Sequence, residues 1–175
     1  MYWVVAFLVI GTLLLAAGCR KNRAPETDHI DGGVVHSVDN DAPKVIRSQQ
    51  IQSFYCKFSA RDRMREDTAL AGNVFVLTAE EIGASLQPYT VTEEFENRNF
   101  MPTEAFFSQL QQIVTKYDFA QYNGRHYKVS GLPPDFGMTL TIRYASGETI
   151  CASNNQSCFL PLEALEELVA LFQNG

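Results

Sequence analysis

Strict alternation of side-chain character from residue 138 to residue 144 constrains the fold of this 175-residue chain more than any other feature. The apolar positions are Met138, Leu140, Ile142 and Tyr144, and the polar positions between them are Thr139, Thr141 and Arg143. Because successive side chains of a strand point to opposite faces, this pattern predicts a half-buried strand. Residues 145–148 then form a turn, and residues 149–153 return as the second strand of a hairpin.

Two helical patterns supply the layer against which such a strand would pack. After Pro102 and Glu104, which suit a first helical turn, apolar side chains recur at helical spacing. These positions are Phe106, Leu110, Ile113 and Tyr117, with Phe107 and Val114 widening the stripe. A second stripe comprises Leu162, Leu165, Leu168 or Val169, and Phe172. We expect both helices to bury one face against a sheet.

Three further segments complete the predicted sheet. Near-alternation from residue 51 to residue 58 and the β-branched run 74–78 predict two strands joined as a hairpin. Residues 87–92 predict a third strand, and Pro88 places it at an edge or at a strand start. The sequence therefore predicts an α+β fold, with a small antiparallel sheet of about five strands packed by two amphipathic helices. We assign this fold to one domain, residues 46–175, which is long enough to bury a core without disulfides or a metal.

The N-terminal 18 residues contain no charged side chain. This run ends in Leu15-Ala16-Ala17-Gly18-Cys19, and cations follow at once within residues 20–23. An apolar run that ends in small residues directly before a cysteine resembles the lipobox of bacterial lipoproteins. The resemblance implies that residues 1–18 are a cleaved signal peptide and that Cys19 is the site of lipid attachment. It also implies that acyl chains such as palmitate anchor the protein to the extracytoplasmic face of the cell membrane.

Two departures from the lipobox leave an alternative open. Secretory signals normally begin with a basic residue, which is missing here, and Ala16 stands where Leu is usual. An apolar run of this length is also about the minimum that spans a bilayer as an uncleaved helix. The cations at residues 20–23 would then hold the domain in the cytoplasm by the positive-inside rule. Both alternatives predict membrane attachment, with residues 19–45 as a flexible tether rich in Pro, Gly, Asp and Asn.

The pairing of the four cysteines is left open by the sequence. If Cys19 carries lipid, at most one disulfide can form, and Cys151 and Cys158 are the local candidates. The alternative is that Cys56, Cys151 and Cys158 are three reduced, buried thiols. The sequence has no CxxC motif, and the spacing of Cys151 and Cys158 matches no common zinc site. We therefore expect neither a metal nor a cofactor.

Charge and motif content narrow the functional class. The net charge of −6 argues against nucleic acid as a partner, because phosphate binding needs clustered positive charge. The sequence lacks GxSxG, HExxH, Walker and GxGxxG motifs. A thiol-dependent enzyme could be composed from Cys56, His126 and Asp118, but a cysteine inside a half-buried strand is usually inert. We therefore expect no catalytic residues, and a non-catalytic binding module whose partner is an envelope protein or a glycan.

A second resemblance covers residues 104–173. Tyr117-Asp118-Phe119, Tyr122-Asn123-Gly124 and residues 144–148 connect a helix, a strand–turn–strand hairpin and a final helix. This order is similar to that of small uncharacterised bacterial lipoproteins. These motifs are structural turns, so the resemblance implies an arrangement of elements and assigns no function to any residue.

Overall fold

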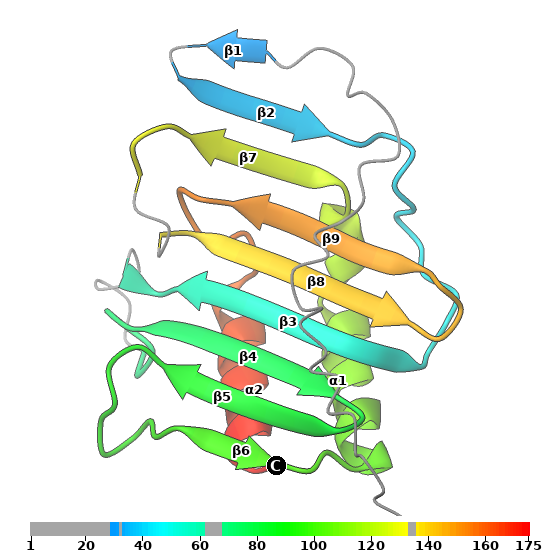
Figure 1. The fold of residues 1–175 in the computed structure, drawn as a ribbon, viewed down its shortest axis with the longest axis vertical. Coiled ribbons are helices and arrows are strands. Elements are labelled where there is room, and N and C mark those ends of the chain that lie inside the picture. Colours follow the sequence, from blue (N-terminus) through cyan, green and yellow to red (C-terminus); the bar gives the residue numbers. More distant parts are fainter. Residues whose placement is uncertain (1–28, 32, 62–67, 133–135) are drawn as a thin grey trace, which may run out of the picture.

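The computed structural model describes residues 29–31, 33–61, 68–132 and 136–175, in which one sheet is packed on one side by two helices (Figure 1). The strands of these residues are β1 (His29–Asp31), β2 (Val34–Val38), β3 (Ile51–Ser59), β4 (Val74–Glu80), β5 (Gly83–Pro88), β6 (Arg98–Phe100), β7 (Arg125–Val129), β8 (Met138–Tyr144) and β9 (Thr149–Asn154). The helices are α1 (Glu104–Lys116), the short 3-10 helix η2 (Phe119–Tyr122) and α2 (Leu162–Gln173). The predicted α+β class is confirmed.

The sheet is larger than predicted, and it is mixed rather than antiparallel. Its strand order is β1-β2-β7-β9-β8-β3-β4-β5-β6, and all neighbours are antiparallel except β7 and β9. The strands missed in the sequence are short, since β1 and β6 have three residues each and β2 and β7 have five. Alternation over so few residues is too weak to predict a strand. The strand predicted at residues 87–92 lies earlier, as β5, and ends at Pro88, which has no N–H for the ladder.

The helix-covered face of the sheet carries the hydrophobic core. In β3, Phe54, Cys56 and Phe58 are 2%, 0% and 0% exposed, whereas Tyr55 between them is 37% exposed. Strand β8 repeats this alternation, as its sequence predicts. Burying one large apolar side chain contributes about 1.5–3 kcal/mol, so this face supplies most of the stabilisation.

The opposite side of the sheet is covered by neither α1 nor α2, both of which lie behind the strands in Figure 1. We call it the open face. Its members in the central strands are Tyr55, Lys57, Thr78, Thr139, Thr141 and Arg143. Polar side chains predominate here because these positions alternate with the core positions of the same strands.

Helix α1 begins where the sequence predicts. Thr103 is its N-cap, and the Thr103 side-chain oxygen accepts a hydrogen bond from the backbone N–H of Phe106 at 3.2 Å. The predicted apolar stripe is buried from Phe106 to Val114, while Tyr117 is the half-buried C-cap. The rings of Phe106 and Phe172 of α2 meet with their centroids 5.1 Å apart, so the two helices share one aromatic contact.

Two segments of the predicted tether, β1 and β2, belong to the sheet. Strand β2 pairs with β7 along its whole length, and the backbone N–H of Asp39 donates to the Gly124 carbonyl at 2.8 Å. The domain therefore extends N-terminal to the boundary expected at residue 46. The sequence around β2 did not predict this strand. Its partner, β7, lies about 90 residues further along the chain, and periodicity within a short segment cannot reveal pairing over such a distance.

An asparagine side chain reinforces the short parallel contact between β7 and β9, which has two residue pairs in register. Asn123 lies directly before β7 and is 3% exposed. Its side-chain oxygen accepts from the backbone N–H of Cys151 at 2.7 Å. Its Nδ2 donates to the carbonyls of Thr149 and Pro43, each at 2.9 Å. One side chain thus joins β9 and the segment before β3 to the start of β7.

A second asparagine acts in the same way at the other end of this contact. Asn155 follows β9, and its side-chain oxygen accepts from the backbone N–H of Val129 at 2.7 Å. Its Nδ2 donates to the carbonyl of the same residue at 2.8 Å. The amide group therefore replaces a peptide group in the ladder and satisfies both backbone groups of Val129.

The predicted turn at Asn123-Gly124 is present, and glycine is required there. Gly124 has a φ of +77°, a conformation that side chains disfavour. A Cβ atom at this position would also lie 2.6 Å from the Cβ of Ala42 and 2.6 Å from the carbonyl oxygen of Asp39. The close approach of residues 39–42 to β7 therefore depends on a glycine.

Candidate functional site

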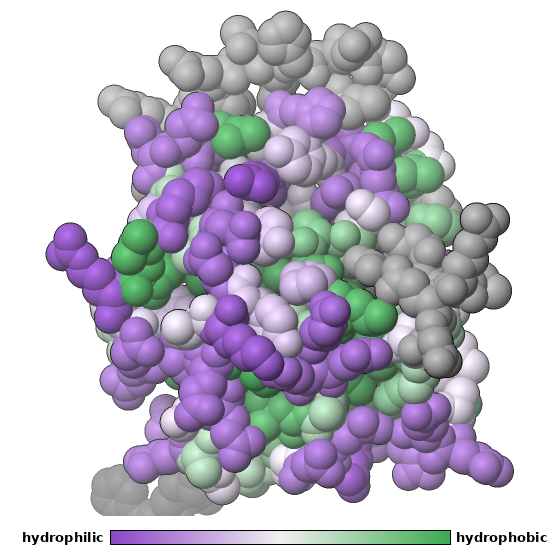
Figure 2. Space-filling model, turned by 180° about the vertical axis from the view of Figure 1, so that it is seen from behind, coloured by the Kyte–Doolittle hydropathy of each residue, from purple (hydrophilic) through white to green (hydrophobic). Residues whose placement is uncertain are grey.

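A groove runs along one flank of α1, between this helix and the segment that enters β3. Its volume is about 1220 Å³, and its lining residues lie within 48–52, 102–108 and 111–116, together with Glu81. It belongs to the helix-covered side of the molecule, where hydrophilic side chains surround smaller hydrophobic patches (Figure 2). We call it the α1 groove.

Amide and hydroxyl side chains dominate the lining of the α1 groove. The amides are five glutamines: Gln49, Gln50, Gln52, Gln111 and Gln112. The hydroxyls belong to Ser48, Thr103, Ser108 and Thr115. An amide both donates and accepts hydrogen bonds, so this lining complements a polar ligand without requiring it to be charged. Phe107 and Ile51 add apolar surface within the same groove.

The α1 groove is elongated along the helix. Glu104 lies in the first turn of α1 and Lys116 in the last, and both line the groove. Their backbones are separated by about 18 Å along the helix axis, at about 1.5 Å per residue. This length corresponds to about five residues of an extended chain.

The wall of the groove opposite α1 is fixed by Glu148, which comes from the turn between β8 and β9. Its carboxylate accepts from the backbone N–H groups of Arg47 and Ser48, each at 3.0 Å, and from the hydroxyl of Ser146 at 2.7 Å. The hydrogen bond from the Arg47 backbone is the main reason that the pKa of Glu148 lies below its usual range. The segment that supplies three of the groove's five glutamines is therefore held by an ionised side chain.

Gln111 lies at the base of the groove, where it is 8% exposed. Its Nε2 donates to the hydroxyl of Thr115 at 3.0 Å. Among the described residues, Gln111 Oε1 and the Tyr144 hydroxyl are the buried side-chain atoms without a hydrogen-bond partner. Burial raises the pKa of Tyr144 to about 12, an effect that the neighbouring Gln111 side chain partly opposes. The phenol is therefore neutral at physiological pH, and it lies in the core beside Gln111.

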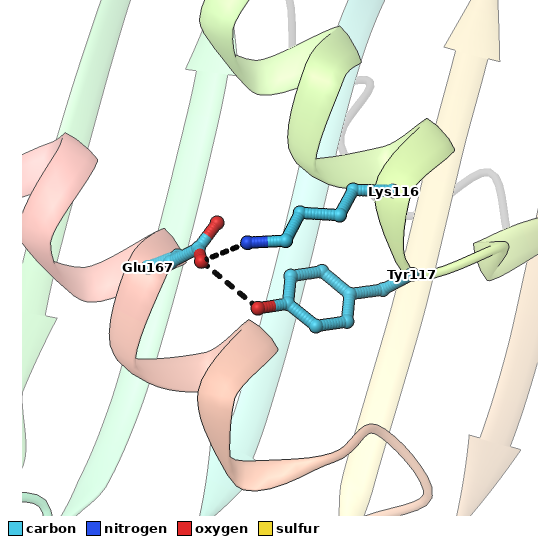
Figure 3. Close-up of polar contacts among 3 residues, drawn as sticks. All are labelled: Lys116, Tyr117 and Glu167. Carbon is cyan, nitrogen blue, oxygen red and sulfur yellow. Dashed lines mark hydrogen bonds and ion pairs between the residues drawn. The ribbon is translucent and has the colours of Figure 1, made fainter.

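A second hollow, of about 740 Å³, lies between α1 and α2. At one end of it, Lys116 and Tyr117 from α1 both point toward Glu167 of α2 (Figure 3). Lys116 Nζ lies 2.5 Å from Glu167 Oε1, and the Tyr117 hydroxyl donates to the same oxygen at 2.9 Å. The Lys116 hydrogen bond lowers the pKa of Glu167, and Glu167 in turn raises the pKa of Lys116. Both charged side chains are largely exposed, so we interpret the cluster as a surface link between two helices.

The disulfide considered between Cys151 and Cys158 is not formed. Cys158 is a buried free thiol, and its Sγ donates to the carbonyl of Ser59 at 2.9 Å. The reason lies in strand geometry, because Ile150 and Ala152 of β9 are buried on the helix-covered side and Cys151 points the other way. Cys158 lies in the core, on the opposite side of the sheet from Cys151. Cys19, the predicted lipid-attachment site, lies outside the described residues.

The residues of the possible thiol-dependent enzyme are not brought together. Cys56 is completely buried on the helix-covered side, and burial raises its pKa well above the usual value, with Cys158 adding to the effect. His126 lies on the open face, where its Nδ1 is 3.0 Å from the hydroxyl of Ser153. Asp118 follows α1 in a left-handed conformation with a φ of +47°. This arrangement provides no nucleophile–base contact between Cys56 and His126.

No protein-family model matches this sequence, and no curated protein or solved structure matches it significantly. Within the described ranges, no three His, Cys, Asp or Glu side chains are grouped as a metal site would require. Neither of the described helices is both long enough and apolar enough to cross a bilayer.

The glutamines of the α1 groove were missed in the sequence. They come from two segments, residues 49–52 and 111–112, that are separated by about 60 residues. Each segment carries glutamines close together in the sequence, and these clusters were the one sequence feature that could have pointed to the groove. Its meaning depends on the fold, because the two segments meet only when α1 packs beside the start of β3.

Proposed function

We propose that this chain is a membrane-tethered, extracytoplasmic binding module without catalytic activity. In this proposal Cys19 carries the lipid anchor, and the α1 groove receives an extended peptide segment of an envelope protein. The observation that carries the proposal is the groove of about 1220 Å³ lined mainly by amides and hydroxyls. This volume exceeds the range of about 300–1,000 Å³ that is typical of small-molecule sites, which favours a polymer segment.

The chemistry of the lining favours a peptide over a sugar. Side-chain amides match the paired donor and acceptor of a peptide group, and five glutamines line the groove. Phe107, Ile51 and Pro102 provide apolar contacts for the side chains of such a peptide. Phe107 is the one aromatic side chain among the described lining residues, whereas sugar sites commonly present several rings. The lining also contains no histidine or cysteine among the described residues, which is consistent with binding rather than thiol chemistry.

The groove can be tested with a phage-displayed peptide library selected on the immobilised full chain in detergent. We expect enriched peptides to lose at least about tenfold in affinity for Ser108→Arg, because the long side chain would fill the groove. The matched control is Gln109→Arg, since Gln109 is the next residue of α1 and lines the other hollow. Failure to enrich any peptide, or equal binding to both variants, would refute the proposed site.

The anchor is tested separately by mass spectrometry of the mature protein from membranes. We expect a lipid-modified Cys19 as the first residue. An intact Met1 would refute the lipoprotein and favour the uncleaved transmembrane anchor with a cytoplasmic domain. Because binding by the α1 groove does not depend on this outcome, the two halves of the proposal can fail independently.

A further inference from the structure

The α1 groove has an acidic end, which lies at the first turn of α1. Glu81 and Glu104 line it there, and both residues are exposed. Glu81 follows β4, and Glu104 is the first residue of α1. The antiparallel pairing of Phe100 with Ala84 brings the chain that enters α1 back beside the turn after β4 (Figure 1). Among the described residues, neither carboxylate forms an ion pair with a cation, so both remain accessible to a charged ligand.

The cation of the groove lining is compensated by a carboxylate of the protein itself. Lys116 lies in the last turn of α1, and its Nζ is 2.5 Å from Glu167 Oε1. Two carboxylates at one end of the groove are therefore opposed by a single ammonium group whose charge is already paired. The whole chain also has a net charge of −6. An acidic ligand is consequently repelled, whereas a basic one is attracted to the acidic end.

Two exposed apolar side chains adjoin the acidic end. Ile82 and Met101 are 82% and 68% exposed. Each is next in the sequence to a residue that lines the groove, Glu81 or Pro102. The pairing of β5 with β6 brings them to the same end of these strands, and we call them the apolar ledge. Apolar surface beside carboxylates suits a lysine or arginine side chain, whose aliphatic stem packs on it while the charged head stays polar in its contacts.

A β-bulge and a buried amide add hydrogen-bonding groups further along the groove. The register of β3 against β8 shifts between Ile51 and Ser53, which makes Gln52 the extra residue. Ile51 is 5% exposed in the core, whereas Gln52 is exposed and lines the groove. Gln111 is 8% exposed, and its Oε1 has no hydrogen-bond partner among the described residues. Acceptors are therefore present along the lining as well as at the acidic end, and a ligand rich in N–H donors complements both.

These features favour one class of peptide. A lysine or arginine side chain combines a positive charge, several N–H donors and a long aliphatic stem. We propose that the α1 groove selects an extended peptide that places a lysine or arginine against Glu81 and Glu104, with the stem of this side chain on the apolar ledge. The inference rests on the proposed function, because it specifies which peptides the groove receives.

Three pools of synthetic peptides of about seven residues, slightly longer than the groove, serve as probes. The peptides are acetylated and amidated, and their central residue is Lys, Gln or Glu, with uncharged residues at every other position. Fluorescence anisotropy measures their binding to the full chain in detergent micelles. We expect the Lys pool to bind about fivefold or more tightly than the Gln pool at low salt, and the Glu pool to bind most weakly. The differences should shrink as salt is raised.

Removing the two carboxylates tests their role directly. Glu81→Gln combined with Glu104→Gln should reduce the affinity for the Lys pool to that for the Gln pool, and should leave the Gln pool unchanged. The matched control is Glu93→Gln combined with Glu96→Gln, which removes the same charge from an exposed loop outside both hollows. This control should retain the preference for the Lys pool.

The apolar ledge is tested by Ile82→Ser combined with Met101→Ser. This change should lower the affinity for the Lys pool about twofold or more, because less apolar surface is covered on binding. Val91→Ser is the control, since Val91 is 57% exposed and lines neither hollow. An equal loss of affinity in Val91→Ser would contradict the assignment of the ledge.

The outcomes that overturn this inference differ from those that refute the proposed function. If no pool binds, the proposed function itself fails. If the Gln pool binds and Ser108→Arg abolishes this binding, the groove is confirmed as a peptide site. A Lys pool without preference, or a preference that survives the loss of both carboxylates, would then refute the inference alone.

Two further results would also overturn it. Binding of the Lys pool that persists in Ser108→Arg would mean that the carboxylates attract cations outside the groove. Calorimetric binding of Ca²⁺ alone, with the same dependence on Glu81 and Glu104, would assign them to a metal ion instead. Thermal unfolding of each variant distinguishes lost binding from lost folding, and exposed positions of this kind are expected to change stability little.

Discussion

Cys56 of β3 is completely buried against the helices, whereas Tyr55 and Lys57 on either side of it face away from them. The same contrast runs through β8, where Leu140 and Ile142 alternate with exposed or half-exposed threonines. One face of the sheet is therefore apolar and covered by the helices, and the other is largely polar. The comparison teaches that strand geometry concentrates the core on one face, so that side chains of the other face can change with little loss of stability.

The sharpest test of this separation is thiol labelling of neighbouring positions. We expect Cys56 in the native full chain to react at least about 10³-fold more slowly than the new thiol of Lys57→Cys, since exposing Cys56 requires the core to open. The raised pKa of Cys56 slows its reaction further. Peptide mapping by mass spectrometry measures both rates. Rapid labelling of native Cys56 would contradict the buried position and would revive the thiol-dependent enzyme.

The next largest effect on stability is expected when one side chain on each face of the sheet is shortened to alanine. Leu140→Ala removes a completely buried side chain and should lower the free energy of unfolding by about 2–5 kcal/mol. Thr139→Ala, one residue earlier and exposed, should change it by less than about 1 kcal/mol. Denaturant unfolding measures both. Similar losses in the two variants would mean that the open face is also part of the core.

The asparagine contacts of β7 extend the comparison to the edge of the sheet. Asn123→Ala removes three hydrogen bonds of a buried side chain and should cost about 2–3 kcal/mol. Asn155→Ala removes two from a half-buried one and should cost about 1–2 kcal/mol. Hydrogen exchange should show increased opening of β7 while β3 remains protected. Equal deprotection of β3 would mean that the edge and centre unfold as one unit.

The smallest effect concerns pH and the wall of the α1 groove. The pKa of Glu148 is lowered in the folded protein, so Glu148 contributes stability above its unfolded value of about 4.5. That contribution disappears as pH falls through the lowered folded value. We expect Glu148→Gln to have a lower Tm than the wild type near neutral pH, and the difference to vanish in acid. Glu96→Gln, at an exposed loop position, is the control for removing one surface charge.

Sequence periodicity predicted the helices and strands in which buried residues recur at a regular interval. The stripe from Phe106 to Val114 and the alternation around Leu140 each repeat often enough to identify a helix and a strand. The same reasoning failed for β2, whose five residues are recognisable only beside β7. The number of strands was underestimated for this reason.

The candidate surfaces were harder to predict than the fold. Gln52 and Gln112 line the same groove through the packing of α1 beside β3, which composition does not reveal. The charges of the open face likewise depend on register, because Lys57, Glu80, Lys128 and Arg143 come from four strands. The lipid attachment proposed for Cys19 is different, since it is read from a local motif and stays a prediction.

The edge position of β1 and β2 has a mechanical consequence for a tethered domain. Among the described residues, β1 is the first strand in the chain, and three residue pairs hold it to β2. Strand β2 is next, with five pairs to β7. Under load these edge strands should detach in sequence while β3, β8 and both helices remain packed. The N-terminal segment would then lengthen before the core of the sheet and the α1 groove lose their shape.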